Sequence, residues 1–315
     1  MCRWRCSVVL LAIGLTLGVP PANGDDPKPC QRYRLASLDI VYDAGGRPTV
    51  EATVNGTKVH MLVDTGAIDS ELSFATVQRL KLRTERLEMD ARVYDAGGVP
   101  IISRATADTF SIGVMSGTNW PFLVSPEHSV ALAEDDDGVL GPDILAQYDV
   151  EFDFGANKIN IFTHDECPGR VAYWTQQPFG TLPFDMDGYH MLARATLDGE
   201  SVDVMIDTGA SVSNMTDKTA HEIMSTKPDP ARMKQVEFDV GDSESHYLYQ
   251  FKMLDLNGLK IENPEFLIYP ERNAAIANLS NRRPTVVLGL STLRQLHLYI
   301  AYREKVMYFT PAGAH

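Results

Sequence analysis

Short runs of alternating apolar and polar residues, separated by turn residues, make up most of the chain. Residues 49–54 and 58–63 alternate in this way on either side of Asn55-Gly56, which is the strongest short signal for a β-hairpin. The apolar spacing typical of helices occurs in short segments, at residues 76–82, 143–147, 217–224 and 291–296. The pattern predicts an all-β fold with few short helices.

The strand pattern occurs twice. Residues 52–67 align with residues 195–210 at an offset of 143, and eight of the sixteen aligned positions are identical. Small changes of offset further along correspond to short loop insertions, so the sequence predicts two copies of one unit of roughly 120 to 130 residues. Two more pairs of segments align at offsets of 144 and 148, namely 122–127 with 266–271 and 139–141 with 287–289.

A break in the pattern separates the two copies. Residues 163–179 contain Cys167 and two prolines, which is typical of a connecting segment. The expected organisation is an N-terminal lobe over residues 25–166, a linker over 167–183 and a C-terminal lobe over 184–315.

The first 24 residues have the features of a secretory signal peptide. Arg3 and Arg5 precede an apolar run over residues 8–19, and Ala22-Asn23-Gly24 forms a small-residue cleavage site. The run is shorter than the ~20 apolar residues that span a bilayer, so we expect no stable membrane span after its removal. The sequence therefore predicts an exported protein, periplasmic or secreted.

The composition indicates a globular protein with a net negative charge. With 44% hydrophobic residues the chain can bury a sizeable core. The chain has 28 basic and 42 acidic residues, and removal of the signal leaves 26 basic residues and a net charge of −16. We therefore expect no nucleic-acid partner.

Cysteine usage follows from export. Cys2 and Cys6 leave with the signal, which leaves Cys30 and Cys167 in an oxidising compartment. We expect one disulfide between them. Two separate thiols remain the alternative, because the sequence does not give the distance between their Cα atoms.

Candidate chemistry lies in one tetrapeptide that each copy carries. Asp-Thr-Gly-Ala follows an apolar strand directly, once at Asp64 and once at Asp207. A single such tetrapeptide is typical of a turn, but pseudo-two-fold pairing of the copies would bring both carboxyls to a central seam. Two carboxyls at about 3 Å cannot both ionise cheaply, so they share one proton. Such a pair can act as both base and acid on a water molecule.

These matched motifs resemble those of a retropepsin-like or pepsin-like aspartic peptidase, over residues 38–309. Each copy also has a paired-apolar-plus-Gly element, Val139-Leu140-Gly141 or Val287-Leu288-Gly289, which in that family threads a strand beside the catalytic loop. The resemblance implies two retropepsin-like β-barrel lobes related by a pseudo-two-fold axis. It also implies aspartic endopeptidase activity with Asp64 and Asp207 as catalytic residues.

The mechanism implied by this resemblance needs no metal or organic cofactor. We expect a monomer with one site at the lobe interface that takes a peptide or protein substrate. Two alternatives stay open. The chain can be a catalytically silent peptide- or protein-binding module with the same fold, or each lobe can pair with a lobe of another chain to form a dimer with two sites.

Residues beside each aspartate have expected supporting roles. Gly66 and Gly209 allow a tight turn, either because a Cβ would crowd the site or because a positive φ is needed. Thr65 and Thr208 have hydroxyls that, in the resembled family, bond to the backbone of the opposite lobe. We expect them to hold the geometry of the pair.

Ala67 and Ala210 stand where many pepsin-type enzymes have Ser or Thr. A missing hydroxyl removes stabilisation of the ionised carboxylate and raises the pKa of the pair. We therefore expect a pH optimum that is less acidic than a pepsin's.

Residues 92–99 resemble the family's flap by position, about thirty residues after Asp64, with Gly97-Gly98 at a hairpin tip. The flap is a mobile hairpin that covers substrate. Tyr94 is a candidate contact on its substrate side. The counterpart in the second copy is residues 240–243.

The sequence predicts no metal site. The eight histidines form no HExxH pair. The acidic run over residues 134–138 lacks the alternating ligand spacing of a calcium loop and is typical of a solvated loop.

Overall fold

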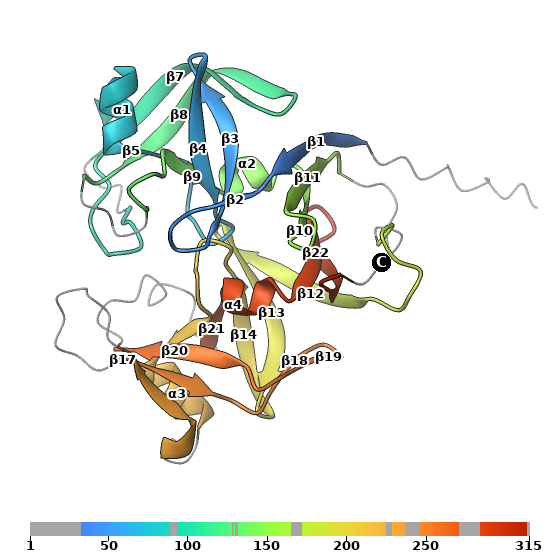
Figure 1. Cartoon of the computed structure of the whole chain (residues 1–315). Helices are drawn as coiled ribbons and strands as arrows, with labels where there is room; N and C mark the ends of the chain where they lie inside the picture. Colours follow the sequence, from blue (N-terminus) through green and yellow to red (C-terminus); the bar gives the residue numbers. More distant parts are fainter. Residues whose placement is uncertain are drawn as a thin grey trace, which may run out of the picture. The chain divides into compact units, whose positions relative to one another are not determined.

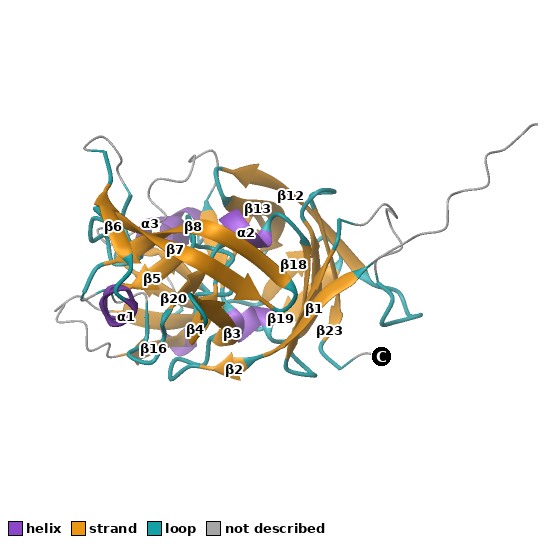
Figure 2. Cartoon of the chain, turned by 90° about the horizontal axis from the view of Figure 1, so that it is seen from above, coloured by secondary structure: helices purple, strands orange, loops and turns teal. Residues whose placement is uncertain are grey.

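A computed structural model of the chain describes residues 33–88, 93–127, 129, 132–164, 172–224, 229–236, 246–270 and 284–313. Strands make up most of this part of the chain, with a few short helices among them (Figure 2). Within the described ranges, no helix combines the length and the apolar character needed to cross a membrane.

The N-terminal half forms a closed barrel of six strands. In the order of their hydrogen bonding these are β3 (Pro48–Val54), β4 (Thr57–Val63), β9 (Gly138–Leu140), β5 (Glu71–Ser73), β8 (Met115–Ser125) and β7 (Ser103–Ile112), and β7 pairs back onto β3. Two further strands, β2 (Val41–Tyr42) and β6 (Arg83–Arg86), extend the sheet beside β3 and β7. Figure 1 shows β3, β4, β7 and β8 in this lobe.

The Asn55-Gly56 turn forms where the sequence predicts it, and the second copy has an equivalent turn at Asp198-Gly199. Asn55 and Gly56 have φ of 49° and 76°, and Asp198 and Gly199 have φ of 52° and 92°. Positive φ at both turn residues gives a turn whose twist matches the flanking strands. In β3 the apolar positions are buried while Glu51 is exposed, as expected for one face against the core.

The C-terminal half repeats the barrel with two interruptions. Its strands are β13 (His190–Leu197), β14 (Glu200–Ile206), β21 (Thr285–Leu288), β15 (Asn214–Thr216), β20 (Glu265–Tyr269), β17 (His246–Gln250), β16 (Met233–Val236), β18 (Met253–Leu256) and β19 (Leu259–Glu262). Here β17 and β18 together take the place of β7, because β17 pairs with β20 and β18 pairs with β13. Likewise, β19 and β20 take the place of β8.

Proline explains one of these interruptions. Pro264 has no backbone N–H for a ladder, and it lies between β19 and β20 beside Asn263, whose φ is 52°. Two backbone bonds bridge the gap, from Phe251 N–H to the Pro264 carbonyl (2.9 Å) and from Asn263 N–H to the Lys252 carbonyl (2.9 Å). The predicted fold class of two β-barrel lobes is confirmed.

Four short helices and one 3-10 turn complete the described elements: α1 (Phe74–Leu80), α2 (Pro142–Leu145), α3 (Asp217–Ile223), α4 (Leu290–Leu293) and η1 (Pro230–Arg232). They lie at the four predicted places, but with different ends. Helix α1 starts before residue 76 because Ser73 caps it, accepting a bond from Thr76 N–H (3.1 Å). Helix α4 ends before residue 296 because Leu296 already belongs to the next strand.

A six-stranded sheet joins the two halves. Its order is β1 (Arg34–Asp39), β11 (Lys158–Phe162), β10 (Asp149–Asp153), β22 (Leu296–Ala301), β23 (Val306–Pro311) and β12 (Gly180–Asp187), so three strands come from each half. Strand β12 starts at Gly180, inside the range expected for the linker. The expected domain boundaries stay a prediction, as does the signal peptide over residues 1–24, which lies outside the described residues.

One face of this sheet packs into the main apolar core and the other carries buried polar groups. On the apolar face, Phe152 of β10 pairs with Leu298 of β22, and both are fully buried. On the polar face, Nε2 of His297 lies 2.9 Å from Oε1 of Glu151, with both side chains almost completely buried. The ring of Trp174 stacks on His297 with centroids 4.3 Å apart. This pair connects a strand of one half to a strand of the other.

We predict that His297→Ala lowers the free energy of unfolding by about 3 kcal/mol, because it leaves the buried carboxyl of Glu151 without this hydrogen bond and removes the ring that stacks on Trp174. Urea denaturation measures this change. Tyr173→Phe is the matched control, since the exposed Tyr173 hydroxyl donates to the same carboxylate (2.8 Å) and its loss is expected to cost about 1 kcal/mol. Equal losses in the two variants would contradict the role assigned to the buried pair.

Candidate active site

Both aspartates lie at the ends of buried strands. Asp64 follows β4 and Asp207 follows β14, and each strand runs parallel to the strand of the paired-apolar-plus-Gly element, β9 or β21. The N–H of Asp64 donates to the Leu140 carbonyl (3.1 Å), and the N–H of Asp207 donates to the Leu288 carbonyl (3.0 Å). The two Asp-Thr-Gly-Ala loops therefore start from equivalent points in the two lobes.

A buried serine supports each loop from below. Oγ of Ser70 accepts from the N–H of Gly141 (2.9 Å), and Oγ of Ser213 accepts from the N–H of Gly289 (3.1 Å). A Cβ on Gly141 would lie 2.7 Å from the carbonyl carbon of Asp69, so only glycine allows the approach. The loop and the strand after it are thus held to one another in each lobe.

Thr65 and Thr208 bond across the seam between the lobes. Oγ1 of Thr65 donates to the Ile206 carbonyl (2.9 Å) and accepts from the N–H of Thr208 (3.1 Å). Reciprocally, Oγ1 of Thr208 donates to the Val63 carbonyl (2.6 Å) and accepts from the N–H of Thr65 (3.1 Å). Both threonines are essentially inaccessible to water, at 1% and 0% exposure. Four buried hydrogen bonds therefore join the two loops.

The structure brings the two aspartates together. A Cβ on Gly66 would lie 2.4 Å from Cγ of Asp207, and a Cβ on Gly209 would lie 2.2 Å from Cγ of Asp64. Neither glycine has a positive φ, so the need for glycine here is the close approach of the opposite carboxyl. The two carboxyl groups are close enough that each changes the pKa of the other.

Burial and mutual repulsion govern the protonation of this pair. Loss of water raises the pKa of Asp64, against a bond of 2.7 Å from the N–H of Gly66. The pKa of Asp207 is raised well above its usual range, by burial first and by the charge of Asp64 next. The N–H groups of Gly209 (2.8 Å) and Ala210 (3.0 Å) donate to Asp207. The pair therefore retains one proton where isolated carboxyls would both be ionised.

The alanines take part through their backbones. The backbone N–H groups of Ala67 and Ala210 donate to the aspartate of their own lobe. Their methyl side chains have no hydroxyl to donate. The site thus has only backbone donors at these two positions.

The expected flap residues form a tight turn. The N–H of Asp95 donates to the Val99 carbonyl (2.9 Å), and Gly98, at φ 77°, donates to the Asp95 carbonyl (2.9 Å). The Asp95 side chain is buried and accepts from the N–H of Val99 (2.7 Å) and the hydroxyl of Ser129 (2.7 Å). Tyr94 is exposed and bridges to Pro100.

Covering of substrate by this turn stays a prediction, and so does the part played by Gly97. The counterpart at residues 240–243 lies outside the described residues. Cys30 and Cys167 also lie outside them, so their pairing stays a prediction.

Sequence reasoning missed Glu71, a third buried carboxyl near the pair. It lies at the start of β5 and accepts a bond from the hydroxyl of Ser125. The pKa of Glu71 is raised to about 7, by burial above all and by the charges of Asp64, Asp95 and Asp69, against the Ser125 hydrogen bond, which lowers it. A charged residue inside a short buried strand was the signal available in the sequence.

Two half-buried carboxyls also lie beside the first loop. Burial, followed by the charge of Asp143, raises the pKa of Asp69 to about 6. Asp143 accepts a bond of 2.6 Å from the hydroxyl of Ser70, the serine that supports the loop. The surroundings of Asp64 are therefore rich in acid groups.

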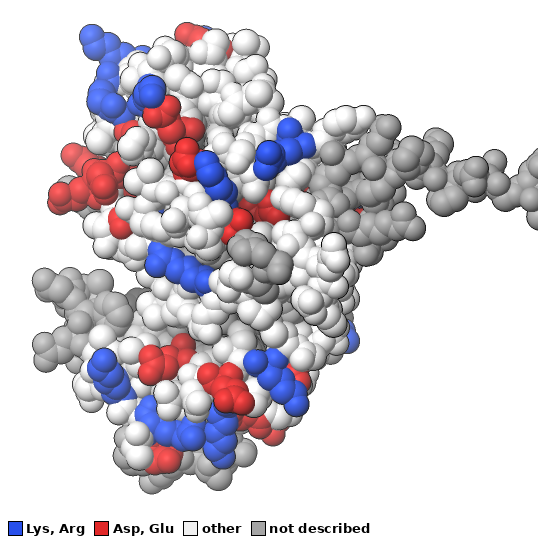
Figure 3. Space-filling model, turned by 45° about the vertical axis from the view of Figure 1, so that its right-hand side comes forward, with Lys and Arg blue, Asp and Glu red and all other residues white. Residues whose placement is uncertain are grey.

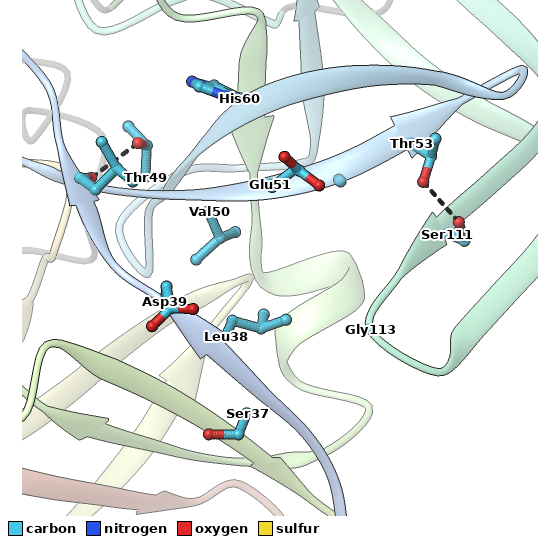
Figure 4. A pocket seen from close by; sticks show the side chains of 12 residues that line it. Ser37, Leu38, Asp39, Thr49, Val50, Glu51, Thr53, His60, Ser111 and Gly113 are labelled. Carbon is cyan, nitrogen blue, oxygen red and sulfur yellow. Dashed lines mark hydrogen bonds between the residues drawn. The ribbon is translucent and has the colours of Figure 1, made fainter.

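The described structure has a cavity of about 490 Å³ elsewhere in the N-terminal lobe (Figure 4). It lies between β1, β3 and the turn after β7, and neither aspartate lines it. The two acidic residues that line it each form an ion pair, Glu51 with Lys58 (2.9 Å) and Asp39 with Lys158 (2.6 Å). No residue of either Asp-Thr-Gly-Ala loop lines this cavity, so it is not the candidate active site.

Over the part of the chain that the structure describes, no group of three His, Cys, Asp or Glu side chains is arranged to hold a metal ion. Basic and acidic side chains are interspersed on the face shown in Figure 3.

Comparison with known proteins points in the same direction. A family model described as aspartyl protease matches residues 50–144 and 193–292, which together make up more than half of the chain. Each matched region contains one Asp-Thr-Gly-Ala loop and the strand that runs beside it. No curated protein matches the chain.

We predict that Glu71→Gln removes a pH-dependent destabilisation. The pKa of Glu71 is about 7 in the folded protein and near 4.5 in the unfolded chain. The unfolded chain therefore releases this proton first, so stability falls between these values as the pH rises, by about 3 kcal/mol. Relative to wild type, Glu71→Gln is expected to gain stability from pH 4 to pH 8. Chemical denaturation at the two pH values measures the difference, and a constant difference would refute the assignment.

Proposed function

The chain belongs to the aspartyl protease family, and on that premise we propose that it hydrolyses peptide bonds with Asp64 and Asp207 as its acid–base pair. The observation that carries the proposal is the mutual approach of the two carboxyls, each packed against the glycine of the opposite loop. The proposal places one site between the two lobes of a single chain.

The chemistry follows from one shared proton. The ionised carboxylate removes a proton from a water molecule held between the two groups, and the water oxygen bonds to the carbonyl carbon of the substrate. The protonated carboxyl donates to the carbonyl oxygen, which stabilises the charge that develops there. Proton transfer to the amide nitrogen and cleavage of the C–N bond then release the products and return the pair to its singly protonated form.

Rigidity supports this role. The four bonds of Thr65 and Thr208 hold the loops in register, so little reorganisation is needed as the reaction proceeds. Both aspartates are half-buried, and the partial loss of water around them strengthens each interaction with the reacting atoms. No step requires a metal or an organic cofactor.

A peptide or protein is the substrate class that this arrangement favours. Ile68 follows Ala67 directly and is exposed, so it offers an apolar contact beside Asp64. Tyr94 and Val99 are also exposed, on the turn that we propose as the flap. We further propose that the protein acts as a monomer after export, in the periplasm or outside the cell.

We predict that Asp64→Asn and Asp207→Asn each lower kcat/KM for peptide cleavage at least ~10³-fold, because an amide cannot share the proton. Cleavage of a peptide library, followed by mass spectrometry, measures the loss. Asp108→Asn, at an exposed aspartate of β7, is the control and is expected to retain wild-type activity. A wild-type protein that binds peptides without cleaving them would instead indicate a silent binding module.

We predict a mildly acidic to neutral pH optimum, and a shift of the acidic limb in Ala67→Ser. The new hydroxyl donates to the carboxylate and favours its ionised form. The acidic limb of the kcat/KM profile is therefore expected to move to lower pH by about half a unit. Ala67→Gly adds no donor and is expected to leave the limb in place. A wild-type optimum near pH 2 would contradict the reasoning from the missing hydroxyls.

A further inference from the structure

The two aspartates do not have equivalent neighbours. Strands β3 and β4 pair in antiparallel register up to Thr49 and Leu62. Continuing this register by two residues places Arg47 opposite Asp64. An arginine remains charged at every pH at which proteins are folded.

The second lobe has a different residue at this position. Strands β13 and β14 pair up to Leu192 and Met205. The same continuation places His190 opposite Asp207. The repeat therefore offers a permanent cation to one aspartate and a histidine to the other.

The guanidinium of Arg47 is held by two carboxylates. Its Nε lies 2.6 Å from Oδ2 of Asp43, and one terminal nitrogen lies 3.1 Å from Oδ2 of Asp136. The backbone N–H of Arg47 also donates to Oδ1 of Asp43 (2.6 Å). With the side chain only 12% exposed, the cation is largely removed from solvent screening.

This cation acts on one member of the pair. The charge of Arg47 lowers the pKa of Asp64, against the effect of burial. Among the described residues, the charge that acts on Asp207 is that of Asp64, which raises its pKa. The one cation among the charges that act on this pair in the described structure therefore acts on Asp64.

We propose that Arg47 is a positioning residue that keeps Asp64 ionised and thereby leaves the shared proton on Asp207. The inference rests on the proposed function and assigns its roles: Asp64 removes the proton from water, and Asp207 donates to the carbonyl oxygen. Arg47 itself touches neither substrate nor water in this scheme.

Other charged groups surround this arrangement. Asp43 and Asp136 oppose the field of Arg47, and the pKa of Asp136 is raised to about 6, by burial above all. The charge of Asp64 also acts on Glu71. Within each pair of variants compared, these groups are the same, so that the charge at residue 47 is what differs.

The turn that carries Arg47 also contacts the second lobe. The Ser211 hydroxyl donates to the Gly45 carbonyl (3.0 Å), and Arg294 donates to the Gly46 carbonyl. The guanidinium of Arg294 also lies over the Tyr42 ring, 4.2 Å from its centroid. A test of Arg47 must therefore separate its charge from the anchoring of this turn.

The experiment is the pH profile of kcat/KM for Arg47→Gln and Arg47→Lys. Without the cation Asp64 is protonated more readily. In Arg47→Gln the acidic limb of the kcat/KM profile is therefore expected to move to higher pH by about one unit, the lower end of the effect of a neighbouring charge. Below the limb, activity falls about tenfold relative to wild type. Arg47→Lys restores the charge and is expected to return the limb to near the wild-type position.

Arg294→Gln is the control for anchoring, because it removes a contact of the same turn while retaining Arg47. It is expected to leave the acidic limb unshifted. Should Arg47→Gln not fold, the pair Asp43→Asn/Arg47→Gln and Asp43→Asn makes the same comparison without the buried anion of Asp43. An unshifted limb in the folded neutral variant, or equal shifts in the Gln and Lys variants, would overturn the inference.

A second readout separates this inference from the proposed function. Carboxyl ¹³C NMR of protein labelled at aspartate follows both titrations directly, with Asp64→Asn and Asp207→Asn to assign the signals. If wild type cleaves no peptide but the pKa of Asp64 is higher in Arg47→Gln than in wild type, the proposed function fails and the electrostatic role of Arg47 stands. If wild type cleaves peptides and the titration of Asp64 does not move, the role of Arg47 fails alone.

Discussion

Two carboxyl groups packed against one another form the constraint on which the rest of the structure depends. Bringing them together is unfavourable, because both lose water and each repels the charge of the other. The contacts that oppose this cost come in matched sets, namely backbone donors from each loop, a glycine against each carboxyl and the reciprocal threonine bonds. A proton shared between the two groups removes the remaining repulsion. The contacts that stabilise the meeting of the two loops are therefore the same ones that hold the two carboxyls together.

Holding such a pair requires the lobes to be joined over more than the two loops. The six-stranded sheet does this with three strands from each half, and its polar face adds the buried contact between His297 and Glu151. The barrels themselves tolerate more change. In the second lobe both long strands are interrupted beside Pro264, yet the ring of strand pairing is preserved. Variation is thus concentrated away from the strands that end at the aspartates.

Much of this arrangement follows from local sequence. Asn55-Gly56 and Asp198-Gly199 determine their turns by their own conformational preferences, and the repeat identifies which strands are equivalent. Long-range electrostatics was beyond such reasoning. Glu71 and Arg47 acquire their importance from the residues packed around them. The sequence near Glu71 does not reveal the burial that raises its pKa, and the sequence near Arg47 does not reveal that both Asp43 and Asp136 pair with it. The helix ends were also missed, because caps and following strands decide them.

Duplication within one chain explains why the site can be uneven. Two identical halves would place the same residue opposite each aspartate, and the proton would have no preferred side. Covalent linkage of the copies lets the halves diverge: Arg47 corresponds to His190, and the exposed Ile68 corresponds to Ser211, which bonds to the first lobe. The two aspartates of the joined repeat therefore have different neighbours, which two identical halves could not provide.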